Sequence, residues 1–346
     1  MLSFWELFCE VKKGFIMSEA VTIDTIKNIL TKNVNKEYSL SREEAIAIMN
    51  LPEDDMTLLM EMAGSLRKKY KGNHVSIHLL TNARSGNCSQ NCAYCAQSCR
   101  SKAEIEKYKW VNDEKLYSDN AFVHDNHLSR HCIGLSGMKF TDEEIEELAE
   151  KIRIMKAQGT HLCCSIGFLT EKQALMLKEA GLDRINHNLN SSRSYYHNIC
   201  TTHTYDDKIQ AIKQALKAGL EVCSGGIMGL GETMEDRIDM VIDIRKLGIT
   251  SVPVNVLNPI PGTPFAELPK LTEDDLCRIV SIFRFLIPNG AIRLAGGRGN
   301  MCDKGKSAFQ SGANAAISGD MLTTSGITIQ DDMNMLKQLK YTVNFL

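Results

Sequence analysis

From residue 75 onward, short apolar runs alternate with longer amphipathic segments along the chain. Each run is four to seven residues long, and most are rich in Val, Ile, Leu or Cys, which is typical of buried strands. The sequence therefore predicts eight strands, at residues 75–79, 131–135, 162–166, 184–188, 222–228, 252–256, 292–295 and 313–317.

Most of the intervening segments carry helix start and stop signals. We expect helices from Thr141 to Gly159, Thr170 to Gly181, Tyr205 to Gly219, Thr233 to Gly248 and Thr272 to Pro288. Strands that alternate with helices form parallel sheets with right-handed crossovers. Eight such units over about 250 residues fit a closed (β/α)8 barrel of the TIM type better than an open sheet.

The segments outside this alternation complete the predicted organisation. Residues 22–70 have helical spacing, with Ser41 and Glu44 placed as a capping box. We therefore expect an N-terminal helical extension over residues 1–70 and a barrel with a C-terminal helix over residues 71–346. Residues 112–129 depart from the pattern, because they are rich in side chains that compete with helical hydrogen bonds. A short or broken helix is expected there.

Composition and charge exclude several classes of protein. The 346 residues include 40 Lys or Arg and 42 Asp or Glu, so the net charge of −2 gives no attraction to nucleic acid or anionic lipid. No apolar run approaches the roughly 20 residues of a membrane-spanning helix. The N-terminal residues lack the features of a signal peptide, and Met17 is the expected natural start. These features predict a soluble, cytoplasmic protein.

Three of the 12 cysteines form a tight group directly after the first predicted strand. Cys88, Cys92 and Cys95 have C-x3-C-x2-C spacing, so their thiolates can converge from one loop. Three thiolates on a [4Fe–4S] cluster leave one iron free to bind a small chelating molecule. A zinc knuckle with Cys99 as fourth ligand is the alternative interpretation.

This motif, with an aromatic residue before its last cysteine, resembles the radical S-adenosylmethionine (SAM) superfamily. Further segments resemble the biotin synthases from residue 75 to the C-terminus. They are Tyr94-Cys-Ala-Gln-Ser98, Asn186-His-Asn-Leu-Asn190, Thr201-Thr-His-Thr-Tyr205, Val222-Cys-Ser-Gly-Gly-Ile-Met-Gly-Leu-Gly-Glu232, Asn255 ahead of Pro261-Gly-Thr-Pro264, and Ile292-Arg-Leu-Ala-Gly-Gly-Arg298.

The resemblance implies a specific reaction. SAM would bind the open iron of the Cys88, Cys92 and Cys95 cluster, and one electron would cleave it to methionine and a 5′-deoxyadenosyl radical. The radical would remove hydrogen from dethiobiotin in two rounds, and sulfur from an auxiliary cluster would close the thiophane ring. A flavodoxin- or ferredoxin-like electron donor and a homodimer are also implied. The alternatives are a methylornithine synthase or hydrogenase-maturation enzyme, or a zinc-binding barrel without radical chemistry.

The strand cysteines predict the auxiliary site. Cys132, Cys163 and Cys223 fall on the second, third and fifth predicted strands, and inward side chains of barrel strands converge. All three match auxiliary-cluster ligands of the resembled family, and Arg293 matches its arginine ligand. Cys200 departs from the family pattern and is a candidate fourth thiolate of the auxiliary cluster. The cluster type therefore stays open between [2Fe–2S] and a four-iron form.

Polar and glycine residues complete the expected SAM and substrate sites. Asn186, Asn188 and Asn190 have the i, i+2, i+4 spacing that places side chains on one face of a strand. A row of buried amides is costly unless a ligand binds it. By resemblance, Asn188 and Asn190 contact the SAM ribose, and Asn186, Asn188 and Asn255 contact the ureido ring. The other SAM-binding residues expected by resemblance are Tyr94, His203, Gly225, Gly226 and Glu232.

Overall fold

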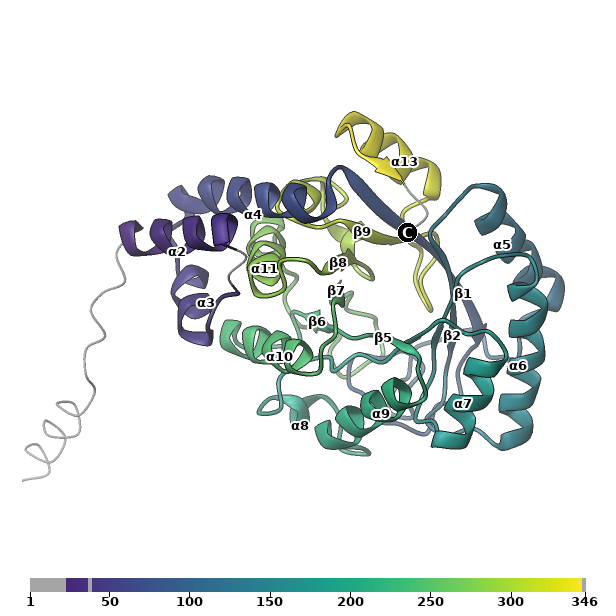
Figure 1. Cartoon of the computed structure of the whole chain (residues 1–346). Helices are drawn as coiled ribbons and strands as arrows, with labels where there is room; N and C mark the ends of the chain where they lie inside the picture. Colours follow the sequence, from purple (N-terminus) through teal and green to yellow (C-terminus); the bar gives the residue numbers. More distant parts are fainter. Residues whose placement is uncertain (1–22, 37–38, 344–346) are drawn as a thin grey trace, which may run out of the picture.

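A computed structural model describes residues 23–36 and 39–343 of the chain. Its centre is a closed barrel, because parallel strands follow one another from β1 to β9 and β9 pairs with β1 in turn. The predicted TIM-type (β/α)8 barrel is confirmed (Figure 1). The strands are β1 His74–Arg84, β2 Arg130–Leu135, β3 Leu162–Ser165, β4 Arg184–Asn186, β5 Glu221–Cys223, β6 Gly226–Met228, β7 Ser251–Val256, β8 Ala291–Leu294 and β9 Ala315–Ser318.

The run predicted as one strand over residues 222–228 is interrupted. Cys223 pairs with Ser251 and Gly226 pairs with Val254, so β5 and β6 keep one register against β7. By this register, Ser224 and Gly225 lie opposite Val252 and Pro253, and Pro253 has no N–H to donate to a ladder. The proline therefore explains why one barrel strand is divided into two.

Helices surround the barrel, and five of them begin as the sequence predicts. Helices α6, α7, α9, α10 and α11 each start after a threonine whose side chain and third following residue form a capping box. The helices are α2 Ile23–Lys36, α3 Arg42–Met49, α4 Met56–Lys71, α5 Asp113–Asp125, α6 Asp142–Lys156, α7 Glu171–Glu179, α8 Tyr196–Ile199, α9 Tyr205–Lys217, α10 Met234–Lys246, α11 Glu273–Leu286, α12 Lys306–Gln310 and α13 Ile329–Gln338, with 3-10 turns at Glu53–Asp55 and Arg298–Asn300. None of the helices in the described ranges has the length and apolar character needed to cross a bilayer.

Helices α2, α3 and α4 precede the barrel; α3 and α4 pack beside α10 and α11, and α2 packs on α3 and α4 (Figure 1). Their buried side chains, such as Ile48 and Leu59, belong to the same apolar core as the barrel helices. Arg278 of α11 donates hydrogen bonds to the Met49 and Leu51 carbonyls, which fixes α3 against the barrel wall. The expected start at Met17 lies outside the described residues.

The expectation of a short or broken helix over residues 112–129 is wrong, because α5 is continuous. The Asn112 side chain caps the helix by accepting a hydrogen bond from the Glu114 N–H. Asn120 is fully buried; its amide nitrogen donates to the Met155 carbonyl, and its Oδ1 accepts from Nδ1 of His131. Tertiary hydrogen bonds therefore satisfy a side chain that would otherwise disfavour the helix.

The C-terminal segment crosses the open end of the barrel. After β9 the chain passes over the cavity described below, and α13 follows. A buried ion pair between Arg298 and Asp332, with 2.8 Å between Nη1 and Oδ1, fixes α13 to the loop after β8. The two-residue strand β10 Thr342–Val343 then pairs with the start of β1.

Candidate active site

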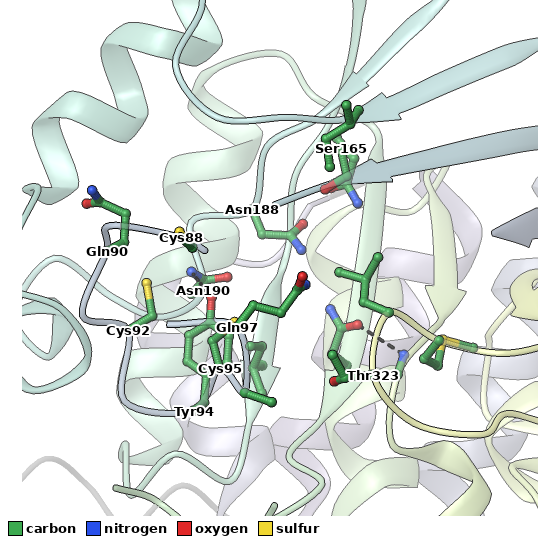
Figure 2. Close-up of a pocket in the computed structure, with 18 of the residues that line it drawn as sticks. Cys88, Gln90, Cys92, Tyr94, Cys95, Gln97, Ser165, Asn188, Asn190 and Thr323 are labelled. Carbon is green, nitrogen blue, oxygen red and sulfur yellow. Dashed lines mark hydrogen bonds between the residues drawn. The ribbon is translucent and has the colours of Figure 1, made fainter. Parts of the chain in front are cut away.

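One cavity of about 370 Å³ opens where the barrel strands end at their carboxyl termini. The cysteine loop after β1 lines one side of it, and the segment from Met321 to Thr324 lines another (Figure 2). Cys132 and Cys163, from inside the barrel, also reach its surface. The cysteine loop and two of the three strand cysteines therefore share one cavity.

The conformation of the cysteine loop is fixed by hydrogen bonds within the loop and to α8. Gly86 has a φ of +76°, and its N–H donates to the Gln97 side chain at 2.8 Å, which closes the loop on itself. The Ala93 N–H donates to the Ile199 carbonyl at 2.9 Å and fixes the loop to α8. Cys88, Cys92 and Cys95 are free thiols, all partly exposed, and line the cavity. Their arrangement leaves space in front of the loop for a cluster and its ligand.

Two thiols of this loop, those of Cys92 and Cys95, have raised pKa values in the absence of metal, which favours their protonated form. Burial raises the pKa of Cys95 to about 11. Contact with the Cys200 thiol, followed by burial, raises the pKa of Cys92. Bound metal cations reverse this preference, because coordination deprotonates a thiol. The three residues therefore fit an iron–sulfur cluster by the chemistry of their donor atoms.

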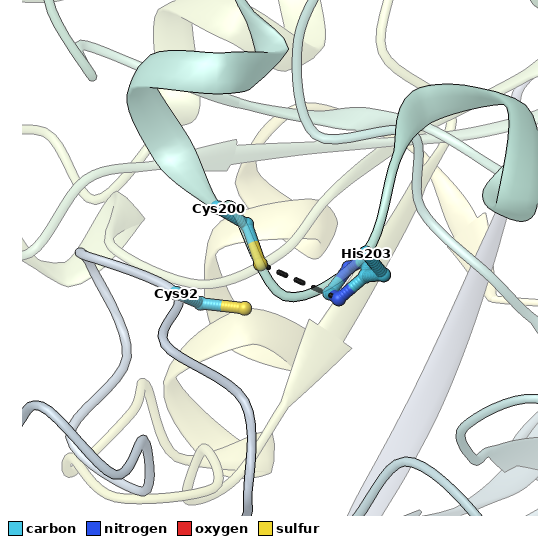
Figure 3. A group of neighbouring side chains, drawn as sticks. All are labelled: Cys92, Cys200 and His203. Atoms are coloured by element: carbon cyan, nitrogen blue, oxygen red, sulfur yellow. Dashed lines mark hydrogen bonds between the residues drawn. The ribbon is translucent and has the colours of Figure 1, made fainter.

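Cys200 lies beside this loop (Figure 3). The ligand atoms of Cys92, Cys200 and His203 all lie within 4.8 Å of one another. The Cys200 sulfur is also 3.2 Å from the Asn91 Oδ1. This position groups Cys200 with the cysteine loop and not with Cys132, Cys163 and Cys223, so it does not favour the hypothesis of a fourth auxiliary thiolate. After β4 the chain runs through α8 to the rim of the barrel, whereas the other strand cysteines lie inside it.

The structure brings Cys132, Cys163, Cys223 and Arg293 together inside the barrel. Cys132 and Cys163 are register partners on β2 and β3, and their thiols are in hydrogen-bond contact. Arg293 on β8 donates through Nη1 to the Cys223 sulfur at 3.1 Å and to Ser251 Oγ at 2.9 Å. Cys164 is the next residue of β3 after Cys163, but its side chain belongs to the apolar core outside the barrel interior.

The environment of these residues fits a bound anion. Arg293 is 2% exposed, its Nε has no hydrogen-bond partner, and no carboxylate within residues 39–343 forms an ion pair with it. A buried cation without an anion is costly. An iron–sulfur cluster held by three thiolates would supply negative charge at this position. Contact with Cys163 and the positive charges of Arg293 and Arg130 lower the pKa of Cys132, which favours its thiolate.

His78 joins this group, and our interpretation of the sequence missed it. It lies on β1 and is 3% exposed, with its Nδ1 3.5 Å from the Cys132 sulfur. Burial and the charge of Arg293 lower its pKa, so the ring is neutral. The sequence could have indicated His78, because side chains along a strand alternate between its two faces. His78 therefore lies on the same face of β1 as Leu80, which lines the cavity.

The asparagine row lies between the two cysteine groups. Asn186, Asn188 and Asn190 all line the cavity. The Asn186 Oδ1 is buried without a partner, and the Asn190 amide donates to the Tyr94 hydroxyl at 3.1 Å. The Asn255 side chain also lines the cavity, but it donates to the Gly226 carbonyl and accepts from the Gly296 N–H, both at 3.0 Å. Asn255 therefore fixes two backbone segments. The Asn186 Oδ1, in contrast, remains available to accept a hydrogen bond from a ligand.

Gly225, Gly226 and Glu232, expected to bind SAM, are not among the residues that line the cavity. A Cβ on Gly225 would lie 1.9 Å from the Pro253 carbonyl oxygen, so glycine is required for close packing of β7. The Glu232 carboxylate accepts from the Gly229 and Leu230 N–H groups and pairs with Arg237 at 2.6 Å. It therefore stabilises the turn after β6, while Ile227 reaches the cavity.

His203 lies at the cavity wall with both ring nitrogens engaged. Its Nδ1 is 2.8 Å from the Gln90 Oε1, and its Nε2 is 2.8 Å from the Tyr196 hydroxyl. Lys208, one turn into α9, also lines the cavity. Burial lowers the pKa of Lys208, and the thiols of Cys92, Cys200 and Cys88 act against this shift. Within residues 39–343, Lys208 has no ion pair with a carboxylate. Lys208 is thus the available cation at this wall.

The closed parallel barrel with three cysteines after its first strand defines a radical SAM barrel. The model of the radical SAM superfamily matches residues 82–244. The model of the Biotin and Thiamin Synthesis associated domain matches residues 253–342, which include β8, Arg293 and the segment over the cavity. The superfamily implies SAM and a [4Fe–4S] cluster as cofactors.

Comparison with curated relatives shows to which family of radical SAM enzymes the chain belongs. The chain is 49% identical to the biotin synthase of Akkermansia muciniphila, over 88% of the chain and 94% of that protein. It is 45% identical to the biotin synthase of Brachyspira hyodysenteriae, over 95% of the chain and 97% of that protein. The chain therefore belongs to the biotin synthase family and is a radical SAM enzyme.

Solved structures confirm the fold alone. Methylornithine synthase superposes with a TM-score of 0.81 at 18% identity, over 91% of this chain and 97% of that one. The FeFe-hydrogenase maturase HydG of Carboxydothermus hydrogenoformans gives a TM-score of 0.79 at 17% identity, over 100% of this chain and 86% of that one. Because the biotin synthases are far more similar in sequence, the alternative radical SAM enzymes and the zinc-binding barrel are not favoured.

Proposed function

We propose that the chain inserts sulfur into dethiobiotin to form the thiophane ring of biotin. The observation that carries this proposal is the single cavity that joins the Cys88, Cys92 and Cys95 loop to the buried Cys132 and Cys163. A radical formed at the loop and a sulfur donor held in the barrel would thus face the same substrate. The superfamily's cluster supplies, when bound, the electron that cleaves SAM and so produces the hydrogen-abstracting radical.

The cavity walls suit a substrate with an apolar chain and one polar ring. Leu80, Leu135, Ile166 and Phe168 contribute apolar surface, and the asparagine row contributes amides. An enclosed site excludes water and holds the reacting carbon close to the radical. The unpartnered Asn186 Oδ1 supports a contact with an N–H of the ureido ring. The Asn188 Oδ1 accepts from the Gly225 N–H at 3.1 Å, which leaves its amide N–H groups for the ligand.

We assign the SAM carboxylate to Lys208, in place of the expected His203. His203 is held by Gln90 and Tyr196, whereas the Lys208 ammonium faces the cysteine loop without an acidic partner among the described residues. The Asn190 amide donates to Tyr94, so its Oδ1 is oriented as an acceptor for a ribose hydroxyl. These contacts would position SAM between the loop and the substrate.

Replacing Lys208 with Met is expected to weaken SAM binding to the reconstituted enzyme by roughly 10–100-fold. A charge-assisted hydrogen bond contributes roughly 1.5–3 kcal/mol, and each 1.4 kcal/mol changes affinity tenfold. Binding of decarboxylated SAM, which lacks the carboxylate, should hardly change. Titration calorimetry with both ligands measures the difference, and Lys213→Met, at an exposed position on the same helix, is the control. Equal losses for both ligands would contradict the assignment.

We propose a [2Fe–2S] auxiliary cluster. With Cys200 at the rim, the buried set has three thiolates, and it divides into two contacting pairs, Cys132 with Cys163 and Cys223 with Arg293. Two pairs of donors suit two irons. The family resemblance supports Arg293 as the fourth donor.

Further features rest on the family resemblance. We propose a homodimer, a flavodoxin- or ferredoxin-like electron donor, and a division into a helical extension over residues 1–70 and a barrel over residues 71–346. The 11 described cysteines are all free thiols, which supports a reducing compartment such as the cytoplasm.

Anaerobic reconstitution tests the proposed function. The purified chain should bind iron and sulfide for two clusters and convert dethiobiotin to biotin with SAM and a reductant, as followed by mass spectrometry. A protein that holds both clusters and cleaves SAM without forming biotin would contradict the proposal.

A further inference from the structure

His78 makes two contacts that connect both halves of the auxiliary site. On one side, its Nδ1 lies 3.5 Å from the sulfur of Cys132. On the other, its Nε2 lies 3.4 Å from Nη2 of Arg293, whose Nη1 donates to Cys223. Within residues 39–343, the imidazole thus links the Cys132 pair to Arg293 by direct contact with both.

These contacts fix the tautomer of the ring. A guanidinium has only donors, so the His78 Nε2 must accept the hydrogen bond from Arg293. The Ser76 hydroxyl, 3.2 Å from the same nitrogen, can donate to it as well. A neutral imidazole that accepts at Nε2 carries its proton on Nδ1. The proton therefore faces the sulfur of Cys132, which must act as an acceptor.

We propose that His78 is a positioning residue that donates a hydrogen bond from Nδ1 to the Cys132 thiolate of the auxiliary cluster. The inference rests on the proposed function, because it needs an auxiliary cluster at this site. Arg293 contacts both halves of the site, Cys223 through Nη1 and the His78 ring through Nη2, and so orients the ring toward Cys132. Hydrogen bonds to cluster sulfurs raise the reduction potential of the cluster. His78 therefore makes the auxiliary cluster easier to reduce.

Easier reduction suits a cluster that donates its sulfur. When a carbon-centred radical forms a bond to a cluster sulfide, one electron of the new bond comes from the radical and one from the sulfide. The second electron of that sulfide lone pair would remain on the cluster and would reduce one iron from the ferric to the ferrous state. The His78 hydrogen bond stabilises the additional negative charge on the cluster.

Substitution of His78 tests this role. His78→Leu removes the donor, and His78→Asn keeps an amide N–H near the position of Nδ1. A redox titration followed by EPR should show the auxiliary potential lowered in His78→Leu by about 59 mV, a tenfold change for one electron, and largely restored in His78→Asn. The Cys88, Cys92 and Cys95 cluster in the same sample should be unchanged, and it serves as an internal control.

Pulsed EPR of the wild-type enzyme with 15N-labelled histidine tests the same contact without a substitution. A weak nitrogen coupling to the reduced auxiliary cluster is expected from a hydrogen-bonded ring. A strong coupling of the size given by a ligating imidazole, or none, would overturn the proposal, as would equal potentials in the Leu variant and the wild type. Iron and sulfide for one cluster only would overturn the proposed function too, whereas two clusters without the coupling would overturn the inference alone.

Discussion

Replacing Cys92 with alanine is expected to abolish reductive cleavage of SAM. Cys92 is the middle thiol of the C-x3-C-x2-C loop, and its sulfur reaches the cavity. Three thiolates are the minimum that holds a four-iron cluster and leaves one iron for SAM, so two will not retain it. The effect should exceed the roughly 10–100-fold loss caused by removing a hydrogen bond that supports a metal ligand. Chromatographic measurement of 5′-deoxyadenosine under anaerobic conditions follows the reaction.

Cys99→Ala is the matched control for this variant. Cys99 is four residues after Cys95, is exposed, and does not line the cavity. We expect its substitution to leave iron content and 5′-deoxyadenosine formation close to those of the wild type. Retained SAM cleavage in Cys92→Ala, or its loss in Cys99→Ala, would show that the cluster ligands are wrongly assigned.

Replacing Cys163 with alanine is expected to stop biotin formation while SAM cleavage continues. Cys163 lies inside the barrel, against Cys132, and not on the cysteine loop. Its loss should remove the auxiliary cluster, and with it the sulfur, but leave the SAM site intact. The two products are measured in one reaction, 5′-deoxyadenosine by chromatography and biotin by mass spectrometry. Loss of biotin with retained 5′-deoxyadenosine indicates a sulfur-donor role, whereas loss of both products indicates a general loss of folding.

The adjacent residue provides the control for this second variant. Cys164 is fully buried in the apolar core on the opposite face of β3. Cys164→Ala removes a thiol of equal size at the next position, so any general effect of a small cavity should appear there too. Biotin formation that survives in Cys163→Ala, or is lost equally in both variants, would argue against Cys163 as an auxiliary ligand.

The barrel could be predicted from the sequence because its signals are local. Threonine caps such as Thr141 and Thr272 mark helix starts, and short apolar runs mark strands. The two errors arose where tertiary contacts decide. Helix α5 continues through Asn120 because the amide nitrogen of Asn120 donates hydrogen bonds to the Met155 carbonyl and the Gln158 side chain, at the end of α6. Opposite Pro253, the fifth barrel strand is divided, which requires knowledge of strand register.

The site was predictable as far as motif spacing and strand position determine it. The three loop cysteines follow from spacing, and the meeting of Cys132, Cys163 and Cys223 follows from inward strand positions. The placement of Cys200 at the rim was not predictable, since it depends on the path of α8. Glu232 and Gly225 were assigned to SAM, but they serve the turn and the packing behind the cavity. His78 escaped notice because its significance lies in contacts with Cys132 and Arg293, far away in sequence.

The central claim is that a radical from SAM acts on the substrate that receives the sulfur. The most direct measurement uses dethiobiotin deuterated at the two carbons that become bonded to sulfur, with the anaerobic enzyme carrying both clusters. We predict that deuterium appears in 5′-deoxyadenosine and that biotin forms with loss of one deuterium from each carbon. Deuterium-free 5′-deoxyadenosine, formed without biotin, would contradict the account.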